Sequence, residues 1–407
     1  MNCRYCATPL DLDLIDLGTQ PPSNSLLTLE DLKTSERYYP LRVKICKRCR
    51  LVQTEDFASR ELFFNHDYPY FSSTSHSWLE HAQSYSIAMI DDLELGESNF
   101  VVEIASNDGY LLKNFVAAGV PCLGVEPTLS TAQAAIDLGI PTIIEFFDQR
   151  QARNIIESYA KADLVICNNV FAHVPDVNDF TQGLSLLLAA QGVITLEFPH
   201  LLNLVKFTQF DTIYHEHYSY FSIETVTKIL TDHGLRIFDV QKLGTHGGSL
   251  RIYVCHDDAD HITTSRVGDI VEEERAGELT SELFNGQFQL RAQRIKNDLI
   301  KFLINVNDDG KKICGYGAAA KGNTLLNFAG IKADLLPFVA DASHSKINKF
   351  LPGSRIPILE PSSVEVYNPD YVLVLPWNIA PEIKLQFSKL ANRGCKFITF
   401  SPDLREV

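Results

Sequence analysis

The stretch "IYHEHYSYF", residues 213–221, carries two His, one Glu and three Tyr. An imidazole can take a proton near neutral pH, a tyrosine hydroxyl can donate to a developing oxyanion, and a carboxylate can orient an imidazole. The stretch therefore predicts proton transfer. Two other interpretations fit: the HxH pair with Glu216 could ligate a catalytic metal, or the aromatic residues could form core packing. In an extended strand His215 and His217 would share one face, so the sequence leaves open which histidine faces a substrate.

Two CxxC pairs form a second group of chemically capable residues. Each pair offers two thiolates to one ion, and two pairs complete a closed tetrahedral site of the kind that zinc prefers. A closed site has no open position for a substrate, so the predicted role is structural. About 39 residues separate the pairs, more than the roughly 15–20 of a common zinc ribbon, and the intervening segment must form a loop or small sheet. A redox dithiol is the alternative. The predicted ligands are Cys3, Cys6, Cys46 and Cys49.

Polar residues also follow several apolar, strand-like segments. "VVEIASNDGYLL" reads as a strand, a turn of small residues and a helix, with Glu103 near the end of the strand. Glu126 in "CLGVEPT" comes about 23 residues later, where an acid can accept both hydroxyls of a ribose. "ICNNVFAHVPD" ends a third segment with two Asn and His173. The GxGxxG fingerprint is absent, which disfavours NAD.

Near the C-terminus "ICGYGAAAKGNTLL" predicts another strand, glycine turn and helix. The free N–H groups of the helix and Lys321 could help to bind a diphosphate, although the spacing is not that of a P-loop. Retention of this unit for packing alone is the alternative. The "THGGS" turn, which contains Gly247 and Gly248, could approach a sugar or phosphate or simply lead into the strand that follows it.

Length and composition set the frame for these motifs. A chain of 407 residues predicts two or three domains, and 45% apolar with 21% charged residues indicates a globular protein. The net charge of −15 disfavours a nucleic-acid partner. No apolar run reaches bilayer length and no secretory signal is visible, so a cytoplasmic protein without a membrane partner is expected. Nothing in the sequence specifies the oligomeric state.

Pattern divides the chain into three predicted domains: residues 1–75 with the CxxC pairs, residues 76–240 with alternating helices and parallel strands, and residues 241–407 with a second α/β unit. The strand "GGSLRIYVCHD" is assigned to the last domain. One long charged helix is expected over residues 271–306. A shorter helix is expected to begin after Thr128 or Ser130 and to stop at Gly139.

The central motifs "ExxSNDG", "GVEP" and "AHVPD", in this order, resemble class I S-adenosylmethionine-dependent methyltransferases. One departure is Ala105, which stands where such enzymes usually have Gly. The resemblance implies an α/β, Rossmann-like core with S-adenosylmethionine as cofactor. The cofactor-binding residues that it implies are Glu103, Ala105, Ser106, Asn107, Gly109, Glu126, Pro127, Asn168 and Asn169.

The whole chain is similar to sugar C-methyltransferases that act on nucleotide-linked 4-keto-deoxysugars. "YPYFSSTS", "YHEHYSYF", "THGGSLRIYV" and "GYGAAAKGN" join the CxxC pairs and the central motifs in that order. This family combines a zinc-binding N-terminal domain, a class I methyltransferase core and a C-terminal Rossmann-like domain. The resemblance implies a nucleotide-linked keto-deoxysugar as partner, with dTDP as the expected nucleotide, and structural Zn²⁺ beside S-adenosylmethionine.

The resemblance also implies roles for individual residues. Methylation of a carbon needs an enolate, hence a base and an acid. His217 is the leading candidate base, Tyr214 the donor to the enolate oxygen and Glu216 the residue that orients or tunes the imidazole, with His173 and Tyr70 lining the same cleft. The expected substrate-binding residues are Phe71, Ser72, His215, Gly247, Gly248 and Lys321. The alternatives are an O- or N-methyltransferase for another small molecule, or a non-catalytic sugar-nucleotide-binding protein.

Overall fold

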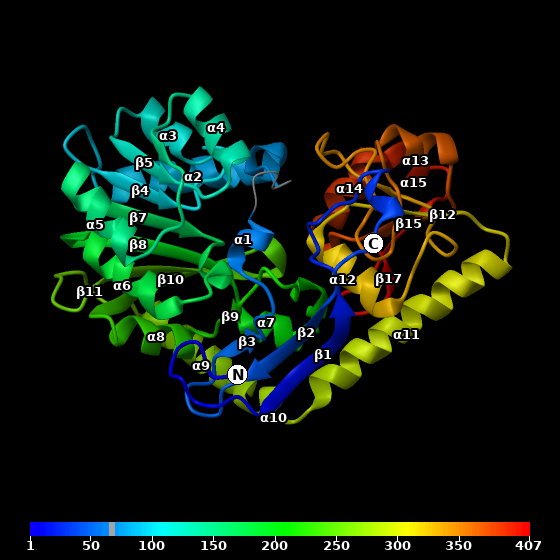
Figure 1. Cartoon of the computed structure of the whole chain (residues 1–407), viewed down its shortest axis with the longest axis horizontal. Helices are drawn as coiled ribbons and strands as arrows, with labels where there is room; N and C mark the ends of the chain where they lie inside the picture. The colour runs from blue at the N-terminus through cyan, green and yellow to red at the C-terminus, as the bar shows by residue number, and fades with distance from the viewer. Residues whose placement is uncertain (65–69) are drawn as a thin grey trace.

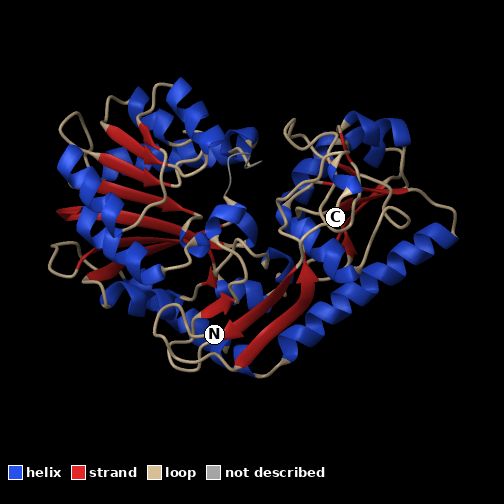
Figure 2. Ribbon diagram, in the orientation of Figure 1, coloured by secondary structure: helices blue, strands red, loops and turns tan. Residues whose placement is uncertain are grey.

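Three β-sheets organise the chain (Figures 1 and 2). The computed structural model describes residues 1–64 and 70–407. The large central sheet and the C-terminal sheet belong to two α/β bodies that lie side by side, and the small N-terminal sheet lies below and between them in Figure 1. Every helix among the described residues is too short or too polar to span a bilayer.

The central sheet has seven strands in the order β10-β11-β8-β7-β4-β5-β6. The strands from β8 to β6 are parallel, whereas β11 and β10 are added antiparallel. Apolar runs form strands here because helices cover both faces. The strand bounds are Val101–Ile104 (β4), Cys122–Val125 (β5), Thr142–Ile143 (β6), Ala162–Asn168 (β7), Leu188–Pro199 (β8), Leu235–Leu243 (β10) and Ser249–His256 (β11).

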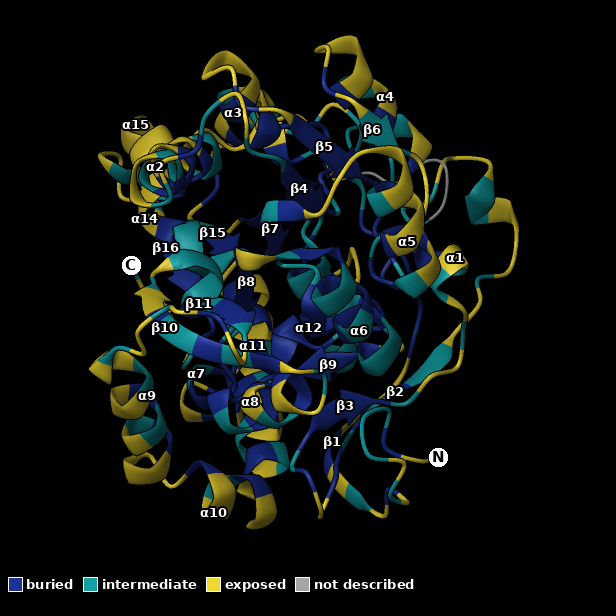
Figure 3. Cartoon of the chain, turned by 90° about the vertical axis from the view of Figure 1, so that its left-hand side faces the viewer, coloured by how far each residue is buried: buried dark blue, intermediate teal, exposed yellow. Residues whose placement is uncertain are grey.

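Helices of this body pack on the sheet in two groups. One core joins the sheet to α2 and α3, and the other joins it to α5, α6 and α8. In Figure 3 the strands β4, β7 and β8 are dark blue, while the outer helices turn exposed faces to solvent. Thr128 caps α4 and Gly139 (φ +79°) follows it, as the sequence predicts. The helix bounds are His76–Asp92 (α2), Leu112–Ala117 (α3), Leu129–Asp137 (α4), Gln149–Ser158 (α5), Val177–Leu187 (α6), Leu201–Lys206 (α7) and Ile223–Thr231 (α8).

The predicted domain boundary at residue 240 falls inside β10, so the central sheet continues beyond it. Strand β11, which contains "SLRIYVCH", pairs antiparallel with both β10 and β8. It therefore extends the central sheet and does not belong to the C-terminal body. The sequence could not show this, because an apolar strand reads alike whichever sheet supplies its partners.

The N-terminal sheet has the order β1-β2-β3-β9, and its strands β1 and β2 lie in the long interval between the two CxxC pairs. Its fourth strand, β9, comes from the residues of the "YHEHYSYF" stretch and pairs antiparallel with β3. The N-terminal domain is thus completed by the segment with the densest chemistry. The bounds are Leu12–Gln20 (β1), Tyr39–Ile45 (β2), Val52–Thr54 (β3) and Ser219–Tyr220 (β9), and the short helix α1 spans Arg60–Phe63.

The C-terminal sheet has the order β14-β13-β12-β15-β16-β17 and is parallel except for its last strand. Helix α12 follows the glycine turn after β12, as predicted. The strands are Ile313–Tyr316 (β12), Val339–Ala340 (β13), Ile358–Leu359 (β14), Tyr371–Val374 (β15), Lys396–Thr399 (β16) and Arg405–Glu406 (β17). The helices are Ala320–Ala329 (α12), Ser362–Tyr367 (α13), Ala380–Gln386 (α14) and Ser388–Ala391 (α15).

The prediction of one long helix over residues 271–306 is wrong. The chain forms three helices there, α9 (Ser265–Ala276), α10 (Leu279–Phe284) and α11 (Gln287–Asp308). Glu278 (φ +50°) and Gly286 (φ +70°) adopt left-handed backbone conformations that interrupt the helical path. Only α11 keeps a continuous buried stripe, formed by Phe288, Ala292, Ile295, Leu299, Leu303 and Val306.

Candidate active site and structural metal centre

The four predicted metal ligands meet at the edge of the N-terminal sheet. Their sulfur atoms all lie within 4.8 Å of one another, and three of the four residues are buried. Each pair sits on a tight turn, in which the residue after the second cysteine, Ala7 or Arg50, has a positive φ and donates its N–H back to the first cysteine. The Gln53 amide donates to the sulfur of Cys3 at 3.2 Å. The donor set suits Zn²⁺ and its closed arrangement suits a structural role.

Within residues 1–64 and 70–407 no other group of three or more His, Cys, Asp or Glu side chains is arranged to hold a metal ion. The structure therefore gives no support to the metal-site interpretation of His215 and His217. The four sulfurs instead belong to the same apolar core as the central sheet, so the metal centre anchors the N-terminal domain against that sheet.

The turn after β4 has the backbone that a close ligand approach requires. Ala105 (φ +57°), Asn107 (φ +50°) and Gly109 (φ +76°) all lie in the left-handed region. The positive φ of Ala105 explains why related enzymes favour glycine at that position. At Gly109 a Cβ would stand 2.4 Å from Cδ1 of Ile140, so no larger residue fits without movement.

Glu126, just beyond the end of β5, fixes this turn. Its Oε2 accepts the Asn107 N–H at 2.9 Å and its Oε1 accepts the Thr128 N–H at 2.9 Å. Burial raises the pKa of this carboxyl although these hydrogen bonds oppose the rise. The predicted ribose contact would use the lone pairs that remain on the same oxygens. Pro127 lies between these two anchored residues.

Buried polar atoms without a protein partner collect at the carboxyl ends of β4 and β7. Such atoms in a folded protein call for a ligand or water. Asn168 ends β7 beside Glu103 of β4, and Asn169 (φ +54°) turns the chain away. The arrangement fits the adenosine and methionine portions of S-adenosylmethionine at the edge where open α/β sheets bind ligands. Among the described residues the orphaned atoms are Glu103 Oε2, Ser106 Oγ, Asp108 Oδ1, Asn168 Nδ2 and Oδ1, and His173 Nδ1.

The predicted substrate segment is bound to this cofactor turn. Asn107 donates its amide to the carbonyl of Tyr70 at 3.1 Å and accepts the Ser72 N–H at 2.9 Å. Phe71 lies between them, and the Tyr70 side chain is 45% exposed. The beginning of "YPYFSSTS", Tyr68 and Pro69, lies outside the described residues.

His217, Tyr214 and His173 form one aromatic cluster. The ring centroid of His217 lies 3.9 Å from that of Tyr214 and 4.6 Å from that of His173. The Thr212 carbonyl oxygen is 2.8 Å from Nδ1 of His217, and since a carbonyl can only accept, Nδ1 carries the proton. Nε2 therefore holds the lone pair, and it has no hydrogen-bond partner in the described chain.

His215 makes different contacts. Its Nε2 lies 3.3 and 3.2 Å from the carbonyls of Tyr39 and Pro40, and its ring stacks on Phe63. The segment turns at this point, with the His217 N–H donating to the Tyr214 carbonyl at 2.9 Å. The extended geometry considered for "HEH" is therefore wrong, and the two imidazoles contact separate parts of the protein.

Glu216 is 2% exposed, and Asn24 donates to both of its carboxylate oxygens, at 2.8 and 2.9 Å. The imidazole of His217 is oriented by a backbone carbonyl, a role that the sequence interpretation had given to Glu216. The carboxylate instead acts on Tyr214, since burial and the charge of Glu216 raise the pKa of that hydroxyl well above its usual range.

Burial also determines the charge state of both histidines. Burial first, and then the neighbouring His173, lower the pKa of His217 well below 6.5. Burial lowers the pKa of His173 to about 4. Near neutral pH the cluster therefore presents neutral imidazoles, which can accept a proton, beside a protonated tyrosine hydroxyl, which can donate one.

The C-terminal domain contributes a half-buried cation next to this cluster. Lys321, in the first turn of α12, donates to Asn378 Oδ1 at 2.9 Å and lies 5.0 Å from the Trp377 ring centroid. The Trp377 indole N–H donates to Asp211 Oδ2 at 2.7 Å. Burial lowers the pKa of Lys321, which Asp211 opposes, and burial raises the pKa of Asp211 to about 6.

Gly247 and Gly248 bring their turn against the same junction. A Cβ on Gly247 would stand 2.3 Å from the Trp377 ring, and its carbonyl accepts from Gln209 at 2.9 Å. A Cβ on Gly248 would stand 2.3 Å from the Asn203 amide. The turn is therefore a place of close packing between domains, which the glycine pattern alone did not reveal.

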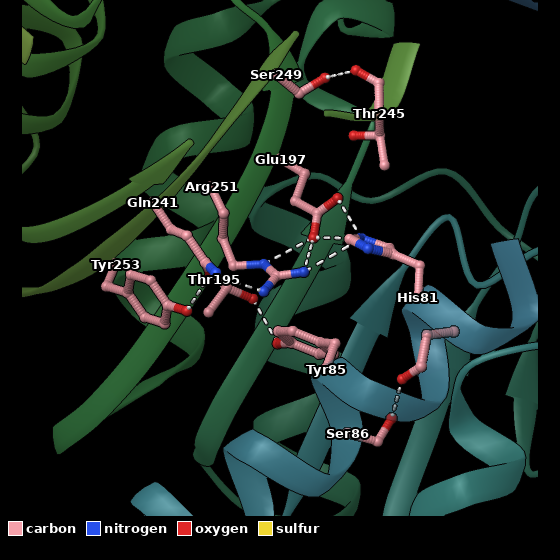
Figure 4. Close-up of polar contacts among 11 residues, drawn as sticks. His81, Tyr85, Ser86, Thr195, Glu197, Gln241, Thr245, Ser249, Arg251 and Tyr253 are labelled. Carbon is pink, nitrogen blue, oxygen red and sulfur yellow. Dashed lines mark hydrogen bonds and ion pairs between the residues drawn. The ribbon is translucent and has the colours of Figure 1, made fainter. Parts of the chain in front are cut away.

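Beneath that turn lies a charged group that the sequence analysis missed. Arg251 of β11 donates its Nε to Glu197 of β8 at 2.7 Å, and His81 Nε2 of α2 lies 3.1 Å from the same carboxylate (Figure 4). Burial raises the pKa of Glu197, but His81 and Arg251 outweigh burial and lower it overall. The signal was available, because Glu197 interrupts the apolar run "VITLEF".

Comparison with known proteins places this site in a family. Three family models match: residues 3–64 ("Putative zinc binding domain"), 78–240 ("Methyltransferase domain") and 244–402 ("C-methyltransferase C-terminal domain"). C-methyltransferase NovU of Streptomyces niveus is 35% identical over 406 residues, covering 100% of this chain and 96% of that protein. The chain belongs to this C-methyltransferase family. The predicted family, fold class, S-adenosylmethionine and structural zinc are thereby confirmed.

Solved structures of methyltransferases match part of the chain more distantly. Magnesium protoporphyrin IX methyltransferase of Synechocystis PCC 6803 is 16% identical, with 44% of this chain and 79% of that chain covered and a TM-score of 0.34. A methyltransferase of Anabaena variabilis is also 16% identical, with 43% and 84% covered and a TM-score of 0.35.

Proposed function

We propose that this C-methyltransferase adds a methyl group to a carbon next to the ketone of a nucleotide-linked 4-keto-deoxysugar, with dTDP as the expected nucleotide. The observation that carries the proposal is the state of His217, a buried neutral imidazole whose Nδ1 is fixed by Thr212 and whose Nε2 lone pair is unpaired in the described chain. The full-length similarity to NovU supports methyl transfer to carbon.

The proposed reaction begins with proton removal. Nε2 of His217 takes the proton of the C–H bond beside the ketone, and the electron pair of that bond moves into an enolate. Tyr214, kept protonated by burial and by Glu216, donates to the enolate oxygen. S-adenosylmethionine would supply the methyl group, with the electron pair of the broken sulfur–methyl bond kept by sulfur and S-adenosylhomocysteine as the leaving group. The new C–C bond replaces the C–H bond, and the proton on His217 passes to solvent.

Lys321 and the turn at Gly247 and Gly248 supply the proposed binding site for the nucleotide diphosphate. Lys321 is a half-buried cation beside Trp377, in a protein whose net charge is −15. A bound dianion would compensate this cation and would also raise the low pKa of His217, to which Lys321 contributes. Phe71 and Ser72, anchored to the cofactor turn, would face the sugar.

The test uses ¹³C-methyl-labelled S-adenosylmethionine and dTDP-4-keto-deoxysugars in deuterated buffer, read by NMR. With the labelled cofactor, the proposal predicts that the methyl carbon is bonded to a sugar carbon. When S-adenosylhomocysteine replaces S-adenosylmethionine, it predicts that deuterium enters at the sugar carbon next to the ketone. A methyl group bonded to oxygen or nitrogen would contradict it and favour the O- or N-methyltransferase alternative. Binding of both ligands without turnover would favour a non-catalytic protein.

A further inference from the structure

The Glu216 carboxylate is held by a residue far away in sequence. Asn24 Nδ2 lies 2.8 Å from Oε1 and 2.9 Å from Oε2, so one amide group bridges both oxygens. An N–H donor favours the ionised form of a carboxylate and fixes its plane. The two residues stand 192 positions apart in the chain, and no sequence motif links them.

Asn24 belongs to the bridging loop, defined here as residues 21–38 between β1 and β2. This loop leaves the N-terminal sheet and crosses to the C-terminal domain (Figure 1). Leu27 and Phe350 exchange backbone hydrogen bonds of 2.9 and 2.8 Å. Further along, Glu36 accepts the Gly353 N–H and pairs with Arg355 at 2.8 Å. The C-terminal domain therefore determines where Asn24 stands.

The C-terminal domain also contacts the beginning of the stretch 213–221. Thr324 of α12 donates to the Ile213 carbonyl at 2.9 Å, and Ser23, next to Asn24, has its hydroxyl 3.5 Å from that of Thr324. Residues 213–216 are thus held at one end by α12 and at the other by the bridging loop. Two domains outside the methyltransferase core position its proposed acid–base residues.

We propose that Asn24 is a positioning residue that keeps Glu216 ionised and in place beside Tyr214. This inference rests on the proposed function, because it gives the Glu216–Tyr214 pair a part in the reaction. Among the described residues, the titratable groups near Glu216 include His173, whose imidazole bonds the Glu216 backbone, the adjacent His217, and the hydroxyls of Tyr214 and Tyr218. The Asn24 amide nitrogen contacts both carboxylate oxygens.

The decisive variant is Asn24→Asp, which keeps the shape and puts a second carboxylate against the first. Two carboxylates at this distance cannot both ionise easily, so the pKa of one rises. A group whose pKa is raised in the folded state stabilises the protein at low pH, and this stability is lost as the pH increases through the folded-state pKa. The melting temperature of Asn24→Asp should therefore fall further below wild type at pH 8 than at pH 5.5, and Glu216→Gln in the same chain should remove that dependence.

Asn285→Asp is the matched control, because Asn285 donates to Glu282 at 3.3 Å on the exposed surface. Its melting temperature should follow wild type at both pH values. A difference between Asn24→Asp and wild type that does not vary with pH would overturn the contact. This measurement needs no substrate, so it decides the contact even if the protein proves inactive on keto-sugars and the proposed function fails.

Activity tests the positioning role itself. Asn24→Ala should lower kcat on the order of 10–100-fold, with the KM for S-adenosylmethionine within about twofold of wild type. Asn285→Ala, which removes an amide–carboxylate contact on the exposed surface, should leave kcat within about twofold of wild type. The kcat of Asn24→Asp should recover toward acidic pH as the shared proton binds. Wild-type kcat in Asn24→Ala, or equal losses in Asn24→Ala and Asn285→Ala, would overturn the positioning role.

Discussion

Replacing His217 by Asn removes the nitrogen proposed as the base and keeps the contact that holds the side chain. In His217 the protonated Nδ1 donates to the Thr212 carbonyl at 2.8 Å, and the amide nitrogen of Asn can take that position. The Nε2 lone pair has no counterpart in Asn. The substitution therefore separates proton abstraction from the local structure.

The expected loss is large compared with any effect on folding. General-base catalysis contributes about 10²–10⁴-fold to a rate, which corresponds to about 3–5 kcal/mol of activation free energy. The lost ring contacts with Tyr214 and His173 should cost about 1 kcal/mol of stability. We expect kcat to fall by about 10²–10⁴-fold while S-adenosylmethionine binding stays within about twofold of wild type.

Two assays check this expectation. Isothermal titration with S-adenosylmethionine reports the cofactor site, and deuterium exchange beside the ketone, in the presence of S-adenosylhomocysteine, reports proton abstraction alone. His233→Asn is a matched control, since its Nδ1 also faces a backbone carbonyl, that of Ile229, at 2.7 Å. Exchange and kcat within tenfold of wild type in His217→Asn would refute the base assignment, and an equal loss in His233→Asn would show that the effect is not specific.

Three further predictions follow from burial and geometry. Elemental analysis should find one zinc per wild-type chain and less in Cys46→Ser, whose melting temperature should fall because structural zinc contributes folding free energy. Gly109→Ala should weaken S-adenosylmethionine binding in titration, since its φ is +76° and its Cβ would meet Ile140 at 2.4 Å. From pH 7 to pH 5 the free energy of unfolding, measured by urea denaturation, should fall by about 2 kcal/mol more in wild type than in His246→Gln, because burial lowers the pKa of His246 to about 4 while the unfolded chain binds protons from about 6.5. An equal pH dependence of the two proteins would contradict the lowered pKa of His246.

Short-range features were readable from the sequence. The CxxC pairs, the small-residue turn after Glu103 and the helix between Thr128 and Gly139 depend on residues within a few positions, where turn chemistry and periodicity act. These patterns predicted the group of four cysteines, the α/β core and the helix after Thr128, all of which the structure contains. Short patterns gave a wrong prediction where the sequence carries no strong helix-ending signal. The single helix expected over residues 271–306 is three helices in the structure.

Only the tertiary structure decided how the chemical residues are shared among domains. Thr212 fixes the tautomer of His217, and Asn24 and Thr324 contact residues 213–216 from the N-terminal and C-terminal domains. Periodicity cannot predict such contacts, because they depend on how whole domains pack, and that packing sums many apolar contacts from all parts of the chain. The assignment of β11 to the central sheet has the same origin, since the partner of a strand is selected by burial and not by its own residues.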